Sequence, residues 1–153
     1  MKKTDLLIIS SLRQNAREKL TEMSKRTRIP VSTIFDRIKL HENGLIKKHT
    51  ALIDFSKLGY NTRANIILKV GKGDREGVKD FLMKHGSINS AFKINNGYDF
   101  LIEAVFTNIK EVEDFLEVLD EKFGVKSKQV FYIIDDLKKE EFLSNPAILS
   151  FGS

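Results

Sequence analysis

The chain has 153 residues, 41% of them hydrophobic and 31% charged, a composition typical of a folded protein rather than a disordered one. No apolar run approaches the ~20 residues of a membrane-spanning helix. The sequence lacks cysteine, which excludes disulfides and thiolate metal sites. The first residues lack the cleavage site of a signal peptide, so we expect a cytoplasmic protein with no membrane partner.

The net charge of +5 is unevenly distributed. Residues 1–61 contain 13 lysines and arginines against six acidic residues, a balance of +7, whereas residues 62–153 contain 13 against 15. This asymmetry favours a polyanionic partner for the first part of the chain. A well-solvated surface would carry similar charge, so the charge indicates nucleic-acid binding only together with a suitable fold.

Two short amphipathic helices are predicted first. The segment TDLLIISSLRQN, residues 4–15, has a broad apolar stripe, and we expect Thr4 or Asp5 to cap its N-terminus. The segment LTEMSKRTR, residues 20–28, forms the second helix. Both are short enough to pack as part of a small helical domain.

The next segment predicts a helix-turn-helix. Pro30 pushes Ile29 out of the helical conformation, and the helix that follows is expected to stop near Asn43 and Gly44. The segment LIKKHTALIDF, residues 45–55, then alternates like a strand. Short helices joined by a tight turn and followed by a strand are typical of a winged helix-turn-helix.

The second half alternates strands and helices in the order βαββαβ, which is the ferredoxin-like arrangement. Strands are predicted in residues 63–70, 88–94, 99–106 and 127–134, and helices in residues 74–86 and 110–124. One face of the first strand is expected to carry Ala64, Ile66, Leu68 and Val70, and one face of the third is expected to carry Phe100, Ile102, Ala104 and Phe106. The central strands are joined by NNGY, in which Asn96 and Gly97 tolerate the positive φ of a tight turn. The expected fold class is therefore α+β, an N-terminal winged helix-turn-helix followed by a ferredoxin-like βαββαβ domain.

The domain boundaries are predicted from the short polar segment SKLGYNT, where the charge balance also changes. The expected parts are a helix-turn-helix domain in residues 1–55, a linker in 56–62, a ferredoxin-like domain in 63–137 and a C-terminal tail in 138–153.

The predicted sheet has apolar residues on both faces, although both helices of this topology cover the same face. The last strand offers Val130 and Tyr132 on one side and Phe131 and Ile133 on the other. Since a monomer rarely exposes such a surface, we expect a second copy to pack sheet against sheet. Alternatively, the N-terminal domain or the tail covers it; the apolar tail residues are Phe142, Ile148, Leu149 and Phe151.

Helical spacing divides the third helix into two faces. The inward stripe, at i, i+3, i+4 and i+7, is expected to comprise Val31, Ile34, Phe35 and Ile38. The outward face and its flanks are expected to comprise Ser32, Thr33, Asp36, Arg37 and Leu40. A recognition helix inserts its N-terminal half in the major groove, so base contacts are expected from this outward face.

Arg37 is expected to be the strongest base reader because a guanidinium can make two hydrogen bonds to guanine. Asp36 can accept from a cytosine amino group, but we favour a structural pairing with Lys39. Leu40 is expected to touch a thymine methyl group, to pack against the next strand or simply to lie exposed. Flanking cations are expected to contact phosphates. The full expected DNA-binding set is Arg28, Ser32, Thr33, Asp36, Arg37, Lys39, Lys47, Lys48 and His49.

Enzyme chemistry is not predicted. The three histidines lie on different elements without metal-ligand spacing, and the segment GKGD is too short for a phosphate-binding loop. No cofactor or metal is expected. An alternative function is an oligomeric small-molecule sensor whose helix-turn-helix binds protein rather than DNA, although the balance of +7 argues against it.

The sequence resembles the Lrp/AsnC family of transcriptional regulators. The resemblance runs from Asp5 to about Asp136, through the segments DLLIISSLRQNAR, LTEMSKRTRIPVSTIFDRIK, LIKKHTALIDFSKLGY and NNGYDFLIEAVF. It implies a DNA-binding N-terminal domain and a C-terminal domain for oligomerisation and effector binding. The expected partners are double-stranded DNA, further copies of the chain in a dimer or octamer, and a small effector such as an amino acid.

The resemblance also implies an effector site in the central hairpin, comprising Asn96, Gly97, Tyr98 and Asp99. In this site Asp99 would hold an amino group and the backbone at Gly97 a carboxylate; an ordinary hairpin turn is the alternative. The chain departs from the family pattern twice. Its recognition helix is one residue short before the closing glycine, and Pro30 stands where the family often has a capping serine.

Overall fold

The computed structural model describes residues 2–148 and divides the chain into two compact units. One unit comprises the residues up to Leu52 together with the segment that begins at Leu137. The other unit spans Ile53–Asp136. Each unit has its own hydrophobic core, and each can therefore be described by itself.

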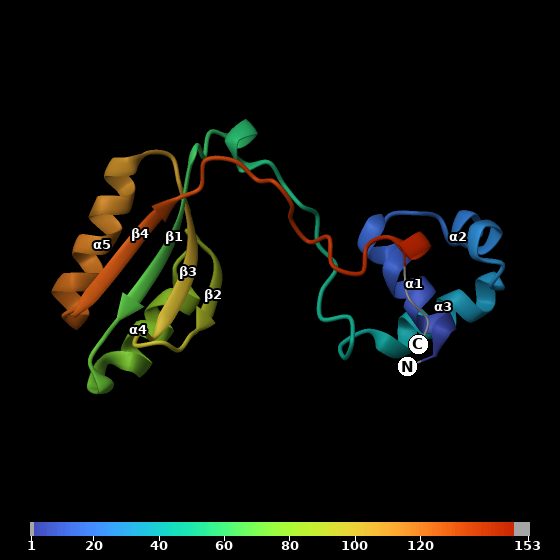
Figure 1. The fold of residues 1–153 in the computed structure, drawn as a ribbon, viewed down its shortest axis with the longest axis horizontal. Coiled ribbons are helices and arrows are strands. Elements are labelled where there is room, and N and C mark those ends of the chain that lie inside the picture. The colour runs from blue at the N-terminus through green and yellow to red at the C-terminus, as the bar shows by residue number, and fades with distance from the viewer. Residues whose placement is uncertain (1, 149–153) are drawn as a thin grey trace. The chain divides into compact units, whose positions relative to one another are not determined.

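Three helices build the first unit: α1 (Lys3–Gln14), α2 (Leu20–Thr27) and α3 (Val31–His41) (Figure 1). Its core is small. Ile8 of α1, Met23 of α2 and Ile34 of α3 are all buried there, and Ile29 from the turn before α3 joins them. Leu7, Leu12, Leu20 and Ile38 are partly buried and pack against these four, so every helix contributes at least two apolar residues to the core.

The N-terminus of α1 differs from the expectation. The N-cap position is Lys2, which provides no side-chain hydrogen bond to the helix. Thr4 and Asp5 lie inside the first turn, so the prediction that one of them caps the helix is wrong. Asp5 is buried and its carboxylate interacts with α3 instead.

The predicted wing strand is also wrong for the part of the chain that the structure describes. Residues 47–54 have no regular secondary structure, and a single bridge between Glu42 and Ile46 is the only pairing near them. A segment becomes a strand only when its backbone groups pair with a neighbour, and residues 2–52 and 137–148 of the first unit form no strand that could pair with it. A 3₁₀ helix, Phe55–Leu58, follows in the second unit.

The C-terminal segment packs with the helices of the first unit. Arg13 on α1 donates hydrogen bonds to the carbonyl oxygens of Glu140, at 2.9 Å, and of Phe142. It also pairs with the Glu140 carboxylate at 3.2 Å. The tail therefore groups with α1 rather than with the sheet. Phe142 is exposed, while Leu149, Phe151 and the side chain of Ile148 lie outside what the structure describes.

The second unit confirms the α+β ferredoxin-like topology. Its elements are β1 (Thr62–Lys69), α4 (Arg75–Lys84), β2 (Ile88–Lys93), β3 (Phe100–Phe106), α5 (Ile109–Phe123) and β4 (Ser127–Tyr132). The strands form one sheet in the order β2-β3-β1-β4, with every neighbouring pair antiparallel. Both helices cover the same face of this sheet (Figure 1).

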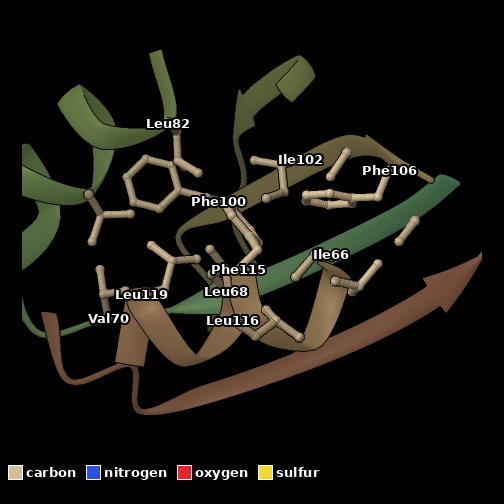
Figure 2. Close-up of a cluster of buried hydrophobic side chains, with 14 residues drawn as sticks. Ile66, Leu68, Val70, Leu82, Phe100, Ile102, Phe106, Phe115, Leu116 and Leu119 are labelled. Atoms are coloured by element: carbon tan, nitrogen blue, oxygen red, sulfur yellow. The ribbon is translucent and has the colours of Figure 1, made fainter. Parts of the chain in front are cut away.

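The core of the second unit lies between that face and the two helices. Strand residues such as Ile66 and Ile102 point toward Phe115 and Leu119 of α5 (Figure 2). The inward residues of β1 and β3 alternate with outward ones, as their sequence predicts. Burial on one face fixes the register of the sheet, because a slip of one residue would turn the apolar set outward.

The opposite face of the sheet is partly apolar and is not covered by either helix. The register places Phe92 and Ile67 beside Leu101, and Phe131 beside Asn65. Phe92 is 56% exposed and Phe131 is 50% exposed. We call this surface, which includes Ile67, Phe92, Leu101, Val105 and Phe131, the open face.

Candidate nucleic-acid interface

A three-residue turn joins α2 to α3. Arg28 takes a left-handed conformation with φ of 61° and donates its backbone N–H to the Ser24 carbonyl at 2.8 Å. The Ser24 hydroxyl in turn donates to the carbonyl of Ile29 at 2.6 Å. Pro30 then occupies the N-cap of α3, as the sequence predicts, and offers no capping side chain. These bonds fix the angle at which α3 leaves the turn.

The inward face of α3 consists of Ile34, Arg37, Ile38 and His41, which are buried or half-buried. These positions follow the spacing i, i+3, i+4 and i+7. Val31 and Phe35, which were predicted to be inward, are 39% and 52% exposed. The helix is therefore rotated by about 60° from the predicted orientation, which corresponds to a shift of the stripe by three residues.

A buried ion pair explains this orientation. Asp5 in the first turn of α1 is only 3% exposed, and both of its carboxylate oxygens accept hydrogen bonds from Arg37. The donors are Nε and Nη2, each at 2.7 Å. His41 Nε2 lies 3.3 Å from Oδ1 of the same carboxylate and is buried without a hydrogen-bond partner among the described residues.

The ion pair stabilises the charged form of both groups. The Arg37 guanidinium lowers the pKa of the Asp5 carboxyl from 3.8 to about 2, although burial by itself would raise it. The carboxylate in turn raises the pKa of Arg37. Two of the donor nitrogens of Arg37 are thus engaged inside the unit. The structure places this side chain between α1 and α3 rather than on the outward face, where the sequence analysis put it.

The outward face of α3 presents a different set of residues. Ser32, Phe35, Asp36 and Lys39 are all exposed, again at i, i+3, i+4 and i+7. Thr33 lies half-buried at the side of this stripe. Lys39 does not pair with Asp36 as expected; its Nζ lies 5.3 Å from the centroid of the Phe35 ring. Phe35 is a candidate contact residue that spacing alone assigned to the core.

Basic residues flank α3 on both sides in the sequence. Arg28 lies in the turn before it, and Lys47, Lys48 and His49 follow it. Arg28, Lys47 and Lys48 are exposed and make no ion pair within residues 2–148. His49 is exposed too, with its Nε2 3.8 Å from Glu42. These side chains are free to interact with a polyanion.

Comparison with known proteins identifies the family. The model of the Lrp/AsnC ligand binding domain matches residues 63–142. The HTH-type transcriptional regulator FL11 of Pyrococcus horikoshii is 34% identical over 136 residues, which cover 88% of this chain and 90% of that protein. FL11 of Pyrococcus furiosus is 34% identical over 131 residues, which cover 85% and 87%. The chain belongs to the Lrp/AsnC family. It is a helix-turn-helix transcriptional regulator that binds DNA.

Solved structures share the fold of this Lrp/AsnC regulator. A transcriptional regulator of Neisseria meningitidis, in complex with L-methionine, has a TM-score of 0.83 and 24% identity, and the match covers 91% of this chain and 93% of that one. LrpC of B. subtilis has a TM-score of 0.81 and 20% identity, with 90% and 97% covered. These similarities establish the arrangement of a helix-turn-helix with a ferredoxin-like domain.

The ligand-binding domain of Lrp/AsnC proteins includes the loop between β2 and β3, where an effector site was expected. Asn96 and Gly97 have φ of 64° and 84°, the positive values that the hairpin signal predicts. The Asp99 carboxylate is engaged by two groups outside the loop. It accepts the backbone N–H of Val70 at 2.8 Å and pairs with Arg75 Nε at 2.9 Å. Asp99 thus joins the loop to the end of β1 and the start of α4.

Tyr98 is tied to the sheet by one hydrogen bond. Its hydroxyl oxygen accepts from Gln129 Nε2 on β4 at 2.6 Å. No group of three side chains within residues 2–148 is arranged to hold a metal ion. Nor is any helix in that range long and apolar enough to cross a membrane.

Proposed function

We propose that this regulator contacts duplex DNA through the outward face of α3, with the N-terminal half of the helix in the major groove. The observation that carries the proposal is the exposed stripe of Ser32, Phe35, Asp36 and Lys39 on the second helix of the helix-turn-helix. Residues up to Leu52 contain 12 lysines and arginines against five acidic residues, so this stripe belongs to a strongly basic unit. Such a charge attracts the phosphate backbone.

Within this interface, the polar residues of the stripe meet base edges, and the cations that flank it meet phosphates. Ser32, Thr33 and Asp36 are the proposed base contacts, with Lys39 at their C-terminal end. Phosphate contacts are assigned to Arg28, Lys47, Lys48 and His49. Arg37 is assigned the role of positioning α3, since its guanidinium is bonded to Asp5.

The open face is proposed to bind a second copy of the chain. It carries two exposed phenylalanines, Phe92 and Phe131, together with Ile67, Leu101 and Val105 on neighbouring strands. An exposed apolar surface of this kind favours burial against a partner. Because two identical open faces are self-complementary in composition, a two-fold symmetric dimer is the simplest assembly. A dimer also presents two copies of α3 to two half-sites on DNA.

A small amino acid is the proposed effector. The regulator from Neisseria meningitidis was solved with L-methionine, and the fold is shared. We place the effector near the loop of residues 95–99, where Asn95, Asn96 and Gly97 are exposed and the backbone N–H groups would hold a carboxylate. The Asp99 carboxylate already has two partners, so the proposed site depends on the loop backbone and on Tyr98 rather than on Asp99.

An electrophoretic mobility shift assay with the full chain tests the proposed function. The probe is a duplex that covers the promoter region of the regulator's own gene. We expect a shifted complex at low salt that weakens as salt rises, because phosphate contacts release counterions. Absence of a shift at low salt with this duplex and with a duplex of unrelated sequence would contradict the proposal. Titration calorimetry with the twenty amino acids tests the effector separately.

A further inference from the structure

An apolar ridge runs along the N-terminal half of α3. Val31 is 39% exposed and Phe35, one turn later, is 52% exposed. The core of the unit includes neither of them: its buried residues are Ile8, Met23, Ile29 and Ile34, and the partly buried residues packed against these are Leu7, Leu12, Leu20 and Ile38. Apolar side chains scattered singly on a surface are normal, but two neighbours at i and i+4 form a continuous apolar contact surface.

The immediate neighbours of this ridge are polar. Ser32 and Asp36 lie beside Phe35 on the outward face, and Lys39 Nζ lies 5.3 Å from the centroid of its ring. The unit as a whole is strongly basic. An apolar protein partner would have to bury these charges, whereas a nucleic acid neutralises them. The charge of the unit therefore favours duplex DNA, which α3 is proposed to contact, as the ligand of the ridge.

Only one group on the base edges of the major groove is apolar, and this is the 5-methyl group of thymine. We infer that Phe35, supported by Val31, contacts a thymine methyl group and makes thymine the preferred base at that position. The inference rests on the proposed function, in which the N-terminal half of α3 enters the groove. Phe35 thereby gives a sparsely charged recognition helix a means of distinguishing sequences.

The test removes the methyl group from the DNA and the ring from the protein in turn. A preferred duplex is first selected from a randomised library with the full-length wild-type protein. This duplex is then synthesised in two forms, one with its thymidines and one in which deoxyuridine replaces them. Deoxyuridine pairs with adenine as thymidine does but lacks the methyl group. Fluorescence anisotropy gives the affinity of each protein variant for both duplexes. Circular dichroism checks that each variant is folded.

For the wild type we expect binding to weaken about fourfold for each contacted methyl group that is removed, the effect of losing one buried carbon. Phe35→Ala is expected to bind the two duplexes equally, and both more weakly than the wild type does. Phe35→Leu keeps an apolar side chain and is expected to retain part of the discrimination. Leu40→Ala tests the competing contact, because Leu40 is an exposed apolar residue in the C-terminal half of the same helix. Met83→Ala is the control: Met83 is an exposed apolar residue of α4 in the other unit, and the variant is expected to distinguish the two duplexes as the wild type does.

Equal binding of both duplexes by the wild type would overturn the inference while leaving DNA binding intact. If Phe35→Ala still prefers the thymidine duplex to the deoxyuridine duplex and Leu40→Ala does not, the contact belongs to Leu40 and the inference is overturned too. A change in oligomeric mass of Phe35→Ala, measured by light scattering, would show that the ridge joins copies of the chain and would also overturn it. Failure to enrich any duplex would contradict the proposed function itself.

Discussion

Asp5 and Arg37 determine how the recognition helix is held in the first unit. The Asp5 carboxylate is buried, and its partner on α3 satisfies both of its oxygens. We expect Arg37→Ala to lower the melting temperature by more than about 5 °C, because it leaves a buried carboxylate without its partner. DNA binding should then weaken for all sequences alike. Asp36→Ala, on the exposed face of the same helix, is the control and should leave the melting temperature unchanged.

The low pKa of Asp5 makes part of the stability pH-dependent. Because the pKa falls from 3.8 to about 2 on folding, the ion pair stabilises the fold fully above pH 3.8, and this contribution is lost as the pH drops through about 2. Asp5→Asn should remove that part of the acid dependence. Urea unfolding at a series of pH values between 5 and 2 gives the free energy of unfolding at each pH. This free energy should fall less steeply with decreasing pH in the variant than in the wild type. Identical slopes would mean that Asp5 is not the responsible group.

On the scale of single elements, α3 has a buried face and an exposed face that stability measurements can distinguish. Ile34→Ala should lower the free energy of unfolding by about 2–5 kcal/mol, since Ile34 is fully buried between the three helices. Phe35→Ala, at the next position, should cost less than about 1 kcal/mol because its ring is half exposed. Chemical denaturation of the two variants measures both values. A loss in Phe35→Ala as large as that in Ile34→Ala would instead support the orientation expected from sequence spacing, in which both side chains face inward.

The comparison of α3 with β1 shows what the sequence could predict. The alternation in β1 was predicted correctly because Ala64, Ile66 and Leu68 are apolar and buried, and nothing polar competes for their face. The inward face of α3 includes Arg37 and His41, which a search for apolar periodicity counts as outward. Their buried partner, Asp5, lies 32 residues earlier in the chain, at a distance that local spacing does not reveal.

The absence of a wing strand and the attachment of the tail to α1 could not be predicted for a similar reason. The residues after α3 alternate like a strand, but pairing needs a neighbouring strand, and the local pattern does not say whether one exists. The attachment of the tail to Arg13 likewise depends on hydrogen bonds to backbone carbonyl oxygens of Glu140 and Phe142, which carry no compositional signal. The ferredoxin-like order of strands and helices was predictable because the apolar residues of each element recur at the spacing typical of a strand or of a helix.

At the scale of the whole molecule, the open face predicts self-association. Phe131→Asp places a charge on this face of each copy, and we expect it to shift the protein from dimer to monomer in size-exclusion chromatography with light scattering. Phe142→Asp changes an exposed phenylalanine of the C-terminal segment and serves as the control. It should leave the mass unchanged. A wild-type protein that is monomeric at micromolar concentration would refute the proposed assembly.

The central claim is that the basic helix-turn-helix unit holds DNA through phosphates around α3, and the salt dependence of binding tests it most directly. Anisotropy titrations with the promoter duplex should give a logarithm of affinity that falls linearly with the logarithm of salt concentration. For Lys47→Ala and Lys48→Ala the slope should decrease by about 1 for each phosphate contact removed, and affinity should drop for specific and unrelated duplexes alike. Lys93→Ala, on β2 in the other unit, should match the wild type. Unchanged slopes in Lys47→Ala and Lys48→Ala, or no binding at low salt, would contradict the claim.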